Sequence, residues 1–541
     1  MKKLLPFFIL LILVACSKEQ NVEMPDENLP QTINEGEMIL GKKLPNPYSL
    51  ENMQAAYNEM SRTRSTPEYE ITPTDLYVRF LPADTAELQL LYNDSLELFA
   101  YPMDYDIVQE GSYYHDPSIP EGQITWQYTT VKPDYKFPKV RYEVLEKCFI
   151  PEEEDDDDEE YDEDDDDITR SASLSFAEEL EMLAFQRLNL LEKFTHNGDP
   201  ETRGLFSKSY KPTGRLTVYD TYSKKQVPIK GVKVRCHVLV KWSTAWTDEN
   251  GNYTMGSKFS IGPHYAIVFD NMKDFTIWGN WGPLAAANFN MGWHNKKGYS
   301  KDINTNASAW DWANVNNAAY DYYKMCEQTG IPKPPANLKI ANFRNFEKSS
   351  ASMMRRIWQP LGIQSNSTFI TFFANMHAYI YTSVFGTLTK FAHPDITIGS
   401  SGYNSDIIYR NVFHELSHAS HFRKVGASYW ADYINYIVTY GAYGNGSGKN
   451  AGICAVGEMW GYAMGNYAYK EKYGKTTLHG SENWFKYRII YDLIDENILT
   501  KKQIIDCMNS KIKSSGQLKQ EMINKYPSKK TEIINTFKKH E

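Results

Sequence analysis

The most informative segment of this chain is residues 412–418, which have the sequence VFHELSH. His414 and His418 are four positions apart, so on an α-helix both side chains lie on one face, about 6 Å from each other. Two imidazoles placed in this way can bind the same metal ion, and Glu415 then lies beside the metal, where it can polarise a water molecule. Chance alone produces this pattern in about 2% of chains of this length. The surrounding sequence therefore decides what the pattern means.

The residues around this motif predict a strand, a loop and a helix, in that order. Residues 395–399 are a short apolar run typical of a buried strand, and residues 400–405 form a loop. The helix is predicted from Asp406 or Ile407 to Arg423. Apolar residues recur at helical spacing within it and predict a buried stripe next to the histidines, made of Ile408, Val412, Leu416 and Ala419.

This arrangement resembles the zincin metallopeptidases, in which the motif helix lies against a strand that binds the substrate backbone. Their extended pattern has Val or Thr two positions before the first histidine, uncharged residues inside the motif and an apolar residue after it. Val412, Leu416, Ser417 and Ala419 fit that pattern. The resemblance implies one Zn²⁺ per chain and hydrolysis of peptide bonds.

Two histidines leave a catalytic zinc one protein ligand short. His421 is seven residues, or about 10.5 Å of helix rise, from His414, which is too far for the two to share one ion. A metzincin would have its third histidine at the position of Lys424, so the resemblance does not extend to that group. Asp432 is within reach after the helix ends near Gly426, but the Gly-Thr-x-Asp setting of the aspzincins is absent.

Glu458 is the third ligand that the sequence favours. Residues 441–452 are rich in Gly, Asn and Ser and must loop back, and residues 456–464 then predict a second apolar-patterned helix. A glutamate on a second helix resembles the gluzincin arrangement, and the small Gly461 would let the two helices approach closely. The alternative is that Glu458 is an ordinary glutamate of the first helical turn, stabilised by the helix dipole.

With this ligand set, Glu415 is predicted to take a proton from the water and to return it to the leaving nitrogen. Tyr462 and His421 are the first candidates for a group that hydrogen-bonds to the tetrahedral intermediate. The sequence does not choose between them and the other nearby donors, which are Tyr440, Tyr443, Tyr467 and His479.

The N-terminus predicts export. Lys2 and Lys3 precede an apolar run at residues 4–14, which is too short to span a membrane as a helix. The ending Leu-Val-Ala-Cys at residues 13–16 resembles the lipobox of bacterial lipoproteins, which implies a lipidated Cys16 and an anchor in the cell envelope, at the outer membrane. The alternative is an ordinary secretory signal with an incidental cysteine.

Composition excludes some partners. The chain has 541 residues and a formal net charge of −10, most of which comes from residues 152–167, acidic at every position except Tyr161. Such a run is typical of an extended linker rather than a calcium loop, which needs spaced ligands and a Gly turn. No Lys/Arg cluster indicates a nucleic-acid surface. The five scattered cysteines after Cys16 predict buried apolar side chains rather than a disulfide framework or a zinc–cysteine site.

The expected fold is a multidomain α+β protein. Residues 76–81, 96–101 and 140–148 predict strands and residues 50–64, 84–93 and 175–194 helices, with Asp84 as a cap. From residue 214 the pattern turns to strands at 215–219, 232–239 and 265–269, and the turn at 247–253, with Asn250-Gly251, predicts a hairpin. Residues 228–253 resemble the carboxypeptidase-regulatory-like (transthyretin-like) β-sandwich. Later candidates are a helix at 310–328 and strands at 337–343 and 369–373.

The expected boundaries are a signal peptide at 1–16, a tether at 17–68, a small α+β module at 69–150, an acidic linker at 151–170, a helical connector at 171–211, the β-sandwich at 212–272 and a mainly helical zincin-like domain at 273–541. The Trp-rich stretch from Trp278 to Trp312 is predicted to pack between the last two domains rather than to bind carbohydrate.

The function that these observations favour is a zinc metallopeptidase acting on peptides or proteins at the envelope. The rival is a non-catalytic lipoprotein that binds glycan or protein through its β-sandwich, with a structural zincin-like domain. Retention of both histidines and Glu415 favours the enzyme. A hydrolase acting on another amide or an ester stays open, and the sequence carries no prediction of oligomeric state.

Overall fold

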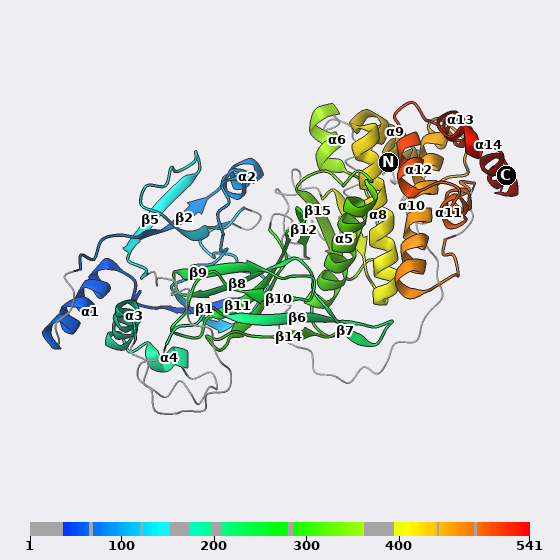
Figure 1. The fold of residues 1–541 in the computed structure, drawn as a ribbon. Helices are drawn as coiled ribbons and strands as arrows, with labels where there is room; N and C mark the ends of the chain where they lie inside the picture. The colour runs from blue at the N-terminus through cyan, green and yellow to red at the C-terminus, as the bar shows by residue number, and fades with distance from the viewer. Residues whose placement is uncertain are drawn as a thin grey trace, which may run out of the picture.

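The computed structural model describes residues 36–63, 69–120, 123–151, 174–195, 208–279, 285–361, 394–440, 443–480 and 484–540. The fold is mixed, about 39% helical and 23% strand, with several sheets and a helical C-terminal region. It confirms the multidomain α+β class (Figure 1). The leader with Cys16, the acidic run and the strand expected at 369–373 lie outside the described residues.

The N-terminal part contains two small antiparallel sheets, one with strand order β4-β2-β5 and the other formed by β1 and β3. Asp84 caps α2 through the backbone N–H groups of Ala86 and Glu87, as predicted. The bounds are β1 (Ile39–Lys43), α1 (Leu50–Thr63), β2 (Asp75–Leu81), α2 (Thr85–Asn93), β3 (Tyr105–Gln109), β4 (Gln127–Val131), β5 (Arg141–Cys148), α3 (Phe176–Arg187) and α4 (Leu191–Thr195).

The prediction of a strand at residues 96–101 is wrong. Only an isolated bridge between Phe99 and Tyr128 forms there. Alternate side chains of the segment are buried, as in a strand, but against the β-sandwich: Arg235 binds both the Glu97 carboxylate and the Leu98 carbonyl. The period-2 pattern therefore reflects an extended segment that a side chain holds, not a paired strand.

The β-sandwich has two sheets. One contains β10-β6-β14 with β7 on β6, and the other contains β9, β8, β11 and β13. The turn at residues 247–253 was expected to make a hairpin, but β10 pairs with β6 of the opposite sheet. Gly251 has positive φ, +81°, whereas Asn250 does not, so the Asn-Gly pair does not form the turn in which both residues have positive φ. The bounds are β6 (Thr213–Asp220), β7 (Lys225–Pro228), β8 (Val232–Val238), β9 (Lys241–Trp246), β10 (Asn252–Thr254), β11 (His264–Asn271), β13 (Asn288–Trp293) and β14 (Lys301–Ile303).

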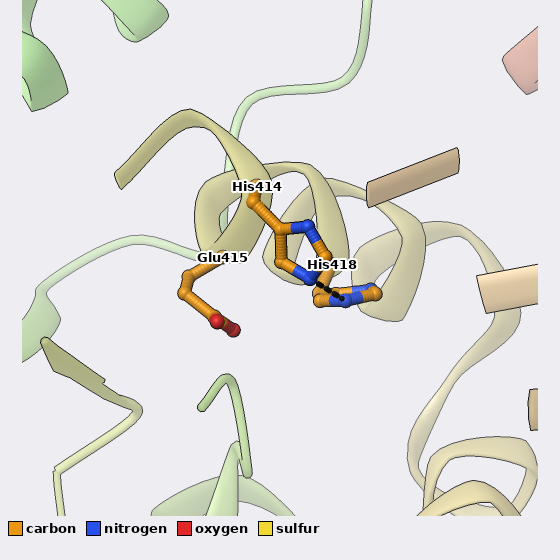
Figure 2. A group of neighbouring side chains, drawn as sticks. All are labelled: His414, Glu415 and His418. Atoms are coloured by element: carbon orange, nitrogen blue, oxygen red, sulfur yellow. Dashed lines mark hydrogen bonds between the residues drawn. The ribbon is translucent and has the colours of Figure 1, made fainter. Parts of the chain in front are cut away.

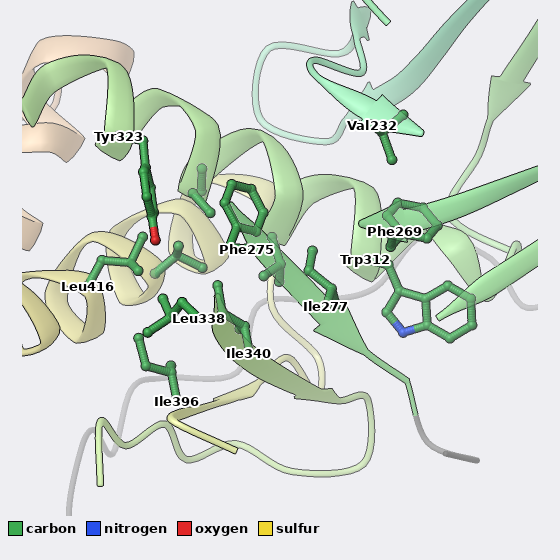
Figure 3. Packing of buried hydrophobic residues seen from close by; sticks show 14 of the residues in the cluster. Val232, Phe269, Phe275, Ile277, Trp312, Tyr323, Leu338, Ile340, Ile396 and Leu416 are labelled. Carbon is green, nitrogen blue, oxygen red and sulfur yellow. The ribbon is translucent and has the colours of Figure 1, made fainter. Parts of the chain in front are cut away.

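One sheet of the sandwich continues into the C-terminal region. Its order is β16-β15-β12-β11-β8-β9, with β12 (Phe275–Trp278), β15 (Leu338–Phe343) and β16 (Ile396–Gly399) paired in parallel. The sheet thus crosses residue 272, the expected domain boundary. Figure 3 shows Leu416 and Tyr323 from two helices packed over its apolar face, among residues that include Leu338 and Ile396.

The C-terminal region is helical. Helix α8 packs against α5, α9 and α10, and it follows β16 directly, as predicted. The bounds are α5 (Ala309–Thr329), α6 (Met354–Leu361), α8 (Ser405–Val425), α9 (Ala427–Tyr440), α10 (Ala451–Tyr473), α11 (Arg488–Asp495), α12 (Lys501–Cys507), α13 (Ser515–Lys525), a short 3₁₀ turn (Pro527–Lys529) and α14 (Lys530–His540). None of these helices, nor any other in the described part of the chain, is long and apolar enough to cross a membrane.

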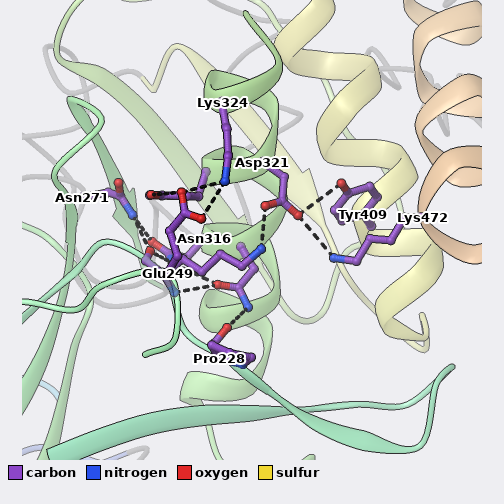
Figure 4. A network of polar contacts seen from close by, with 11 residues as sticks. Pro228, Glu249, Asn271, Asn316, Asp321, Lys324, Tyr409 and Lys472 are labelled. Atoms are coloured by element: carbon purple, nitrogen blue, oxygen red, sulfur yellow. Dashed lines mark hydrogen bonds and ion pairs between the residues drawn. The ribbon is translucent and has the colours of Figure 1, made fainter. Parts of the chain in front are cut away.

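A polar network ties the sandwich to these helices (Figure 4). The Asp321 carboxylate of α5 accepts from Lys230 of the sandwich at 2.7 Å, from Tyr409 of α8 at 3.3 Å and from Lys472 of α10 at 3.5 Å. One carboxylate therefore joins three helices and a sandwich loop, which fixes the position of α8 relative to the sheet.

The tryptophans and cysteines behave as predicted. Trp310 and Trp312 of α5 are buried in the main hydrophobic core, and Trp278 of β12 is buried in a small cluster with Ala341 and Phe343, as a packing role requires. The five cysteines of the described part are free and buried, namely Cys148, Cys236, Cys326, Cys454 and Cys507.

Candidate metal centre

Helix α8 holds both histidines on a fixed frame. Its apolar stripe of Ile408, Val412, Leu416 and Ala419 is fully buried, against α5 and the sheet. Asp406 lies in its first turn and Arg423 and Lys424 in its last, charges that favour the helix dipole. The opposite face, with His414 and His418, is thereby turned towards α10.

The two histidines meet at one point (Figure 2). Their Nε2 atoms are 3.0 Å apart, and the rings are perpendicular, with centroids 4.7 Å apart. His414, Glu415 and His418 offer ligand atoms within 4.8 Å of one another, and all three side chains are buried. This group of side chains could hold a metal ion.

Glu458 of α10 lies next to both histidines. Its Oε2 is 3.6 Å from His414 Nε2 and its Oε1 is 3.6 Å from His418 Nε2. The residue is 1% exposed, and Oε2 makes no hydrogen bond among the described residues. The structure therefore brings together the three residues that the sequence selected, although their role as metal ligands stays a prediction.

Gly461 lets the two helices approach this closely. A Cβ at that position would lie 2.8 Å from the Cε1 and Nε2 atoms of His418 and 3.1 Å from His414 Cε1. Gly457 and Gly465, one turn away on either side, pack against Tyr433 and against the backbone of Arg410 in the same way. This stripe of glycines on α10 leaves room for the imidazoles, as predicted for Gly461.

Tyr433 of α9 is a site residue that sequence reasoning missed. It is buried, and its hydroxyl donates a hydrogen bond to Glu458 Oε1. Asp432, the neighbour considered as a ligand from the sequence, makes no ion pair with the histidines in the described structure; its backbone carbonyl accepts from Asn450. An aromatic residue in an apolar helix pattern gives no signal that separates a ligand's partner from a core residue.

Burial sets the protonation of the ligand candidates. It lowers the pKa of His414 well below its ordinary value and that of His418 to about 3, so both imidazoles are neutral, the form that binds metals. Burial also raises the pKa of Glu458 to about 7. The hydroxyls of Tyr433 and Tyr443 partly offset this effect, because hydrogen bonds to the carboxylate lower its pKa. A nearby cation would favour the carboxylate form.

The carboxyl of Glu415 is shifted towards its protonated form. Burial raises the pKa of its carboxyl well above the ordinary value, and the charge of Glu458 acts in the same direction. A hydrogen bond from the Ala351 backbone N–H lowers it. A raised pKa makes this carboxyl a better proton acceptor once it is ionised, which suits a general base.

Tyr462 is the better placed of the two first candidates for an intermediate-binding group. Its ring lies 4.6 Å from that of His414 between centroids, and its hydroxyl is 3.2 Å from that of Tyr443. His421 is instead fully buried against Tyr429 and Trp430.

The other donor candidates lie elsewhere. Tyr440 is 41% exposed and packs on Tyr436, and Tyr467 lies under Lys501. The ring of His479 packs edge-on against Tyr469, with centroids 5.0 Å apart. Tyr443 and Tyr462 therefore remain as the hydroxyl pair of the site.

A small cleft of about 30 Å³ opens beside the group. His414, Glu415, Tyr462 and Arg410 line it, together with Ser349 from the segment that bridges β16. A volume of roughly 10–15 Å³ already accommodates a water molecule, so the cleft has room for water next to Glu415 and His414.

Neither the models of known protein families nor the curated proteins contain a match to this chain.

Proposed function

We propose that this protein is a zinc-dependent metallopeptidase of the zincin type, with a gluzincin-like ligand set. The observation that carries the proposal is the meeting of His414, His418 and Glu458 at one buried point, with Glu415 beside it. Two histidines and one glutamate with an open fourth position are the ligands of a catalytic rather than a structural zinc.

The donor groups are spaced as zinc ligands are. Metal–ligand bonds of about 2.0–2.1 Å in a tetrahedron place ligand atoms roughly 3.3 Å apart. Here the two Nε2 atoms are 3.0 Å apart, and each lies 3.6 Å from a carboxylate oxygen of Glu458, Oε2 for His414 and Oε1 for His418. Glu458 Oε2 has no hydrogen-bond donor among the described residues, and a buried carboxylate oxygen without a partner is costly. A cation at this point would satisfy that oxygen and both imidazoles.

Zinc, when bound, supplies a Lewis acid that polarises a carbonyl and lowers the pKa of water to about 7. The protein's own groups do the rest. Glu415 takes the proton of the attacking water and delivers it to the leaving nitrogen of the peptide. Tyr462 and Tyr443 present hydroxyls on the side of His414, where Tyr462 can donate a hydrogen bond to the oxygen that gains charge.

Peptides or proteins are the proposed substrates, and the cell envelope is the proposed location. Peptide-bond hydrolysis follows from the zincin likeness of the motif, its helix and the strand before it. The envelope, with an anchor at Cys16, follows from the Leu-Val-Ala-Cys ending of the leader alone. Both assignments are independent of the sandwich.

Removal of zinc is expected to stop hydrolysis. Protein loaded with one zinc per chain should cleave a peptide mixture, a zinc chelator should reduce cleavage by at least about 100-fold, and added zinc should restore it. Mass spectrometry of the products measures this and locates the cut bonds. Cleavage that persists after zinc is shown to be absent would contradict the proposal, as would a zinc-loaded protein that cuts nothing in the mixture.

A further inference from the structure

A second and larger cavity lies away from the metal centre. It measures about 590 Å³ and is bounded by the N-terminal module, the sheet of the sandwich and the start of the C-terminal region. Small-molecule sites typically have volumes of about 300–1,000 Å³. The metal ligands do not line this cavity, so the proposed peptidase chemistry does not account for it.

One wall of the cavity is a continuous chain of charges. Arg235 binds Glu97 at 3.1 Å, Lys233 bridges Glu97 at 3.1 Å and Asp270 at 3.2 Å, and Thr276 donates to Asp270 at 3.0 Å. Arg235 is 6% exposed, and its Nε makes no hydrogen bond within the described structure. Buried polar groups lower the stability of a protein unless they have hydrogen-bond partners. A cavity without a ligand is therefore not expected to have this many polar groups in its wall.

Lys339 continues this row of charged groups, and its ammonium has N–H donors that no described residue accepts. Its Nζ donates to Thr276 at 2.9 Å, and no ion pair of this lysine forms among the described residues. An ammonium group has three donors, so two remain for a ligand. Burial lowers the pKa of Lys339 to about 8, against the charges of Asp270, Asp395 and Asp274, which raise it.

Charge and aromatic surface together indicate the class of ligand. The cations Lys233, Arg235 and Lys339 are balanced by the carboxylates Glu97 and Asp270 on the wall and by Asp274, which also lines the cavity. A charge-balanced wall gives no net attraction for an ion, but it offers many donors and acceptors. Trp246 and Tyr92 add ring surface to the cavity and are 40% and 36% exposed. The Lys233 ammonium lies over the Trp246 ring, 5.2 Å from its centroid, so a ligand packed on this ring would also be next to that cation.

We propose that this cavity binds a neutral carbohydrate of one or two sugar units. A sugar ring has a face of C–H bonds, which packs on an aromatic ring, and an edge of hydroxyls, which pair with closely spaced donors and acceptors. Trp246 would provide the platform, while Lys339 and the Glu97–Lys233–Asp270 chain would bind the hydroxyls. The protein would thus hold a glycan with one part and cut a peptide with another.

Titration calorimetry of the full-length protein against maltose, lactose, N-acetyllactosamine and chitobiose tests this. We expect at least one to bind with a Kd in the range of about 0.1–5 mM, and Trp246→Ala to weaken it by at least about 10-fold. Lys339→Met should weaken it several-fold by removing donors. Tyr142→Ala, an equally exposed aromatic outside the cavity, should leave it unchanged.

The Glu415→Gln variant separates this inference from the proposed peptidase. It should bind the sugar as wild type does, because Glu415 does not line this cavity. Three results would overturn the carbohydrate site: no binding of any of the four sugars at about 10 mM, undiminished binding by a folded Trp246→Ala protein, or displacement of the sugar by an unrelated peptide.

Discussion

Replacing Glu415 with glutamine is expected to lower kcat/KM for peptide hydrolysis by about 10²–10⁴-fold while zinc stays bound. Glutamine keeps the size of the side chain but cannot accept a proton from water. His414, His418 and Glu458 are untouched by the change, so the metal keeps its ligands. The apo protein should be no less stable than wild type, because the change replaces a buried carboxyl whose charged form burial disfavours.

Initial rates on a peptide identified from the mixture measure the effect, with zinc content determined on the same samples. Glu471→Gln is a matched control, since Glu471 is an exposed glutamate of α10 outside the site, and it should cleave at the wild-type rate. A Glu415→Gln protein that keeps more than about a tenth of the wild-type rate would refute Glu415 as the acid–base group.

Glu458→Ala is expected to reduce zinc affinity by more than about 100-fold. Removing a group that only hydrogen-bonds to a metal ligand lowers metal affinity by about 10–100-fold. Glu458 is proposed to bind the zinc directly, so its loss should lower the affinity further. The change leaves two neutral imidazoles, 3.0 Å apart, as the remaining donors. Peptide cleavage should fall with zinc occupancy.

Competition with a chromophoric zinc chelator measures the affinity, and melting of the metal-free proteins shows whether the variant is folded. Asp432→Ala is the matched control, because Asp432 lies on α9 beside the site and is the carboxylate that the aspzincin pattern would use. The reverse outcome, zinc lost in Asp432→Ala and kept in Glu458→Ala, would assign the third ligand to Asp432.

Much of the centre's frame could be predicted because it depends on helical periodicity. The HExxH spacing places His414 and His418 on one face, and the apolar stripe turns that face away from the sheet. Glu458 could be chosen from the likeness to the gluzincins, in which a glutamate on a second helix is the third ligand, and Gly461 because two helices that approach closely need a small residue. The structure brings them together in that way.

The contacts that Tyr433 and the Ala351 N–H make in the site could not be predicted, because nothing in the sequence marks them. Tyr433 sits in a helix rich in aromatic residues, where a hydroxyl that binds Glu458 has the same spacing as one in the core. The contact from Ala351 is made by the backbone, which any residue can provide, so no side-chain pattern marks it.

The predicted fold was wrong where contacts with residues distant in sequence replaced pairing between neighbouring segments. Residues 96–101 alternate like a strand, yet Arg235 holds them as an extended segment. The turn around Gly251 looks like a hairpin, yet its second strand joins β6 in the other sheet. In both cases the local pattern is real, and the partner is distant in sequence.

The position of the metal is the most direct test of the central claim. Anomalous diffraction from crystals of the zinc-loaded protein, recorded at the zinc absorption edge, should show one peak per chain, about 2.0–2.2 Å from His414 Nε2, His418 Nε2 and a carboxylate oxygen of Glu458. A protein that binds no zinc, or a peak whose ligands exclude Glu458, would contradict the account.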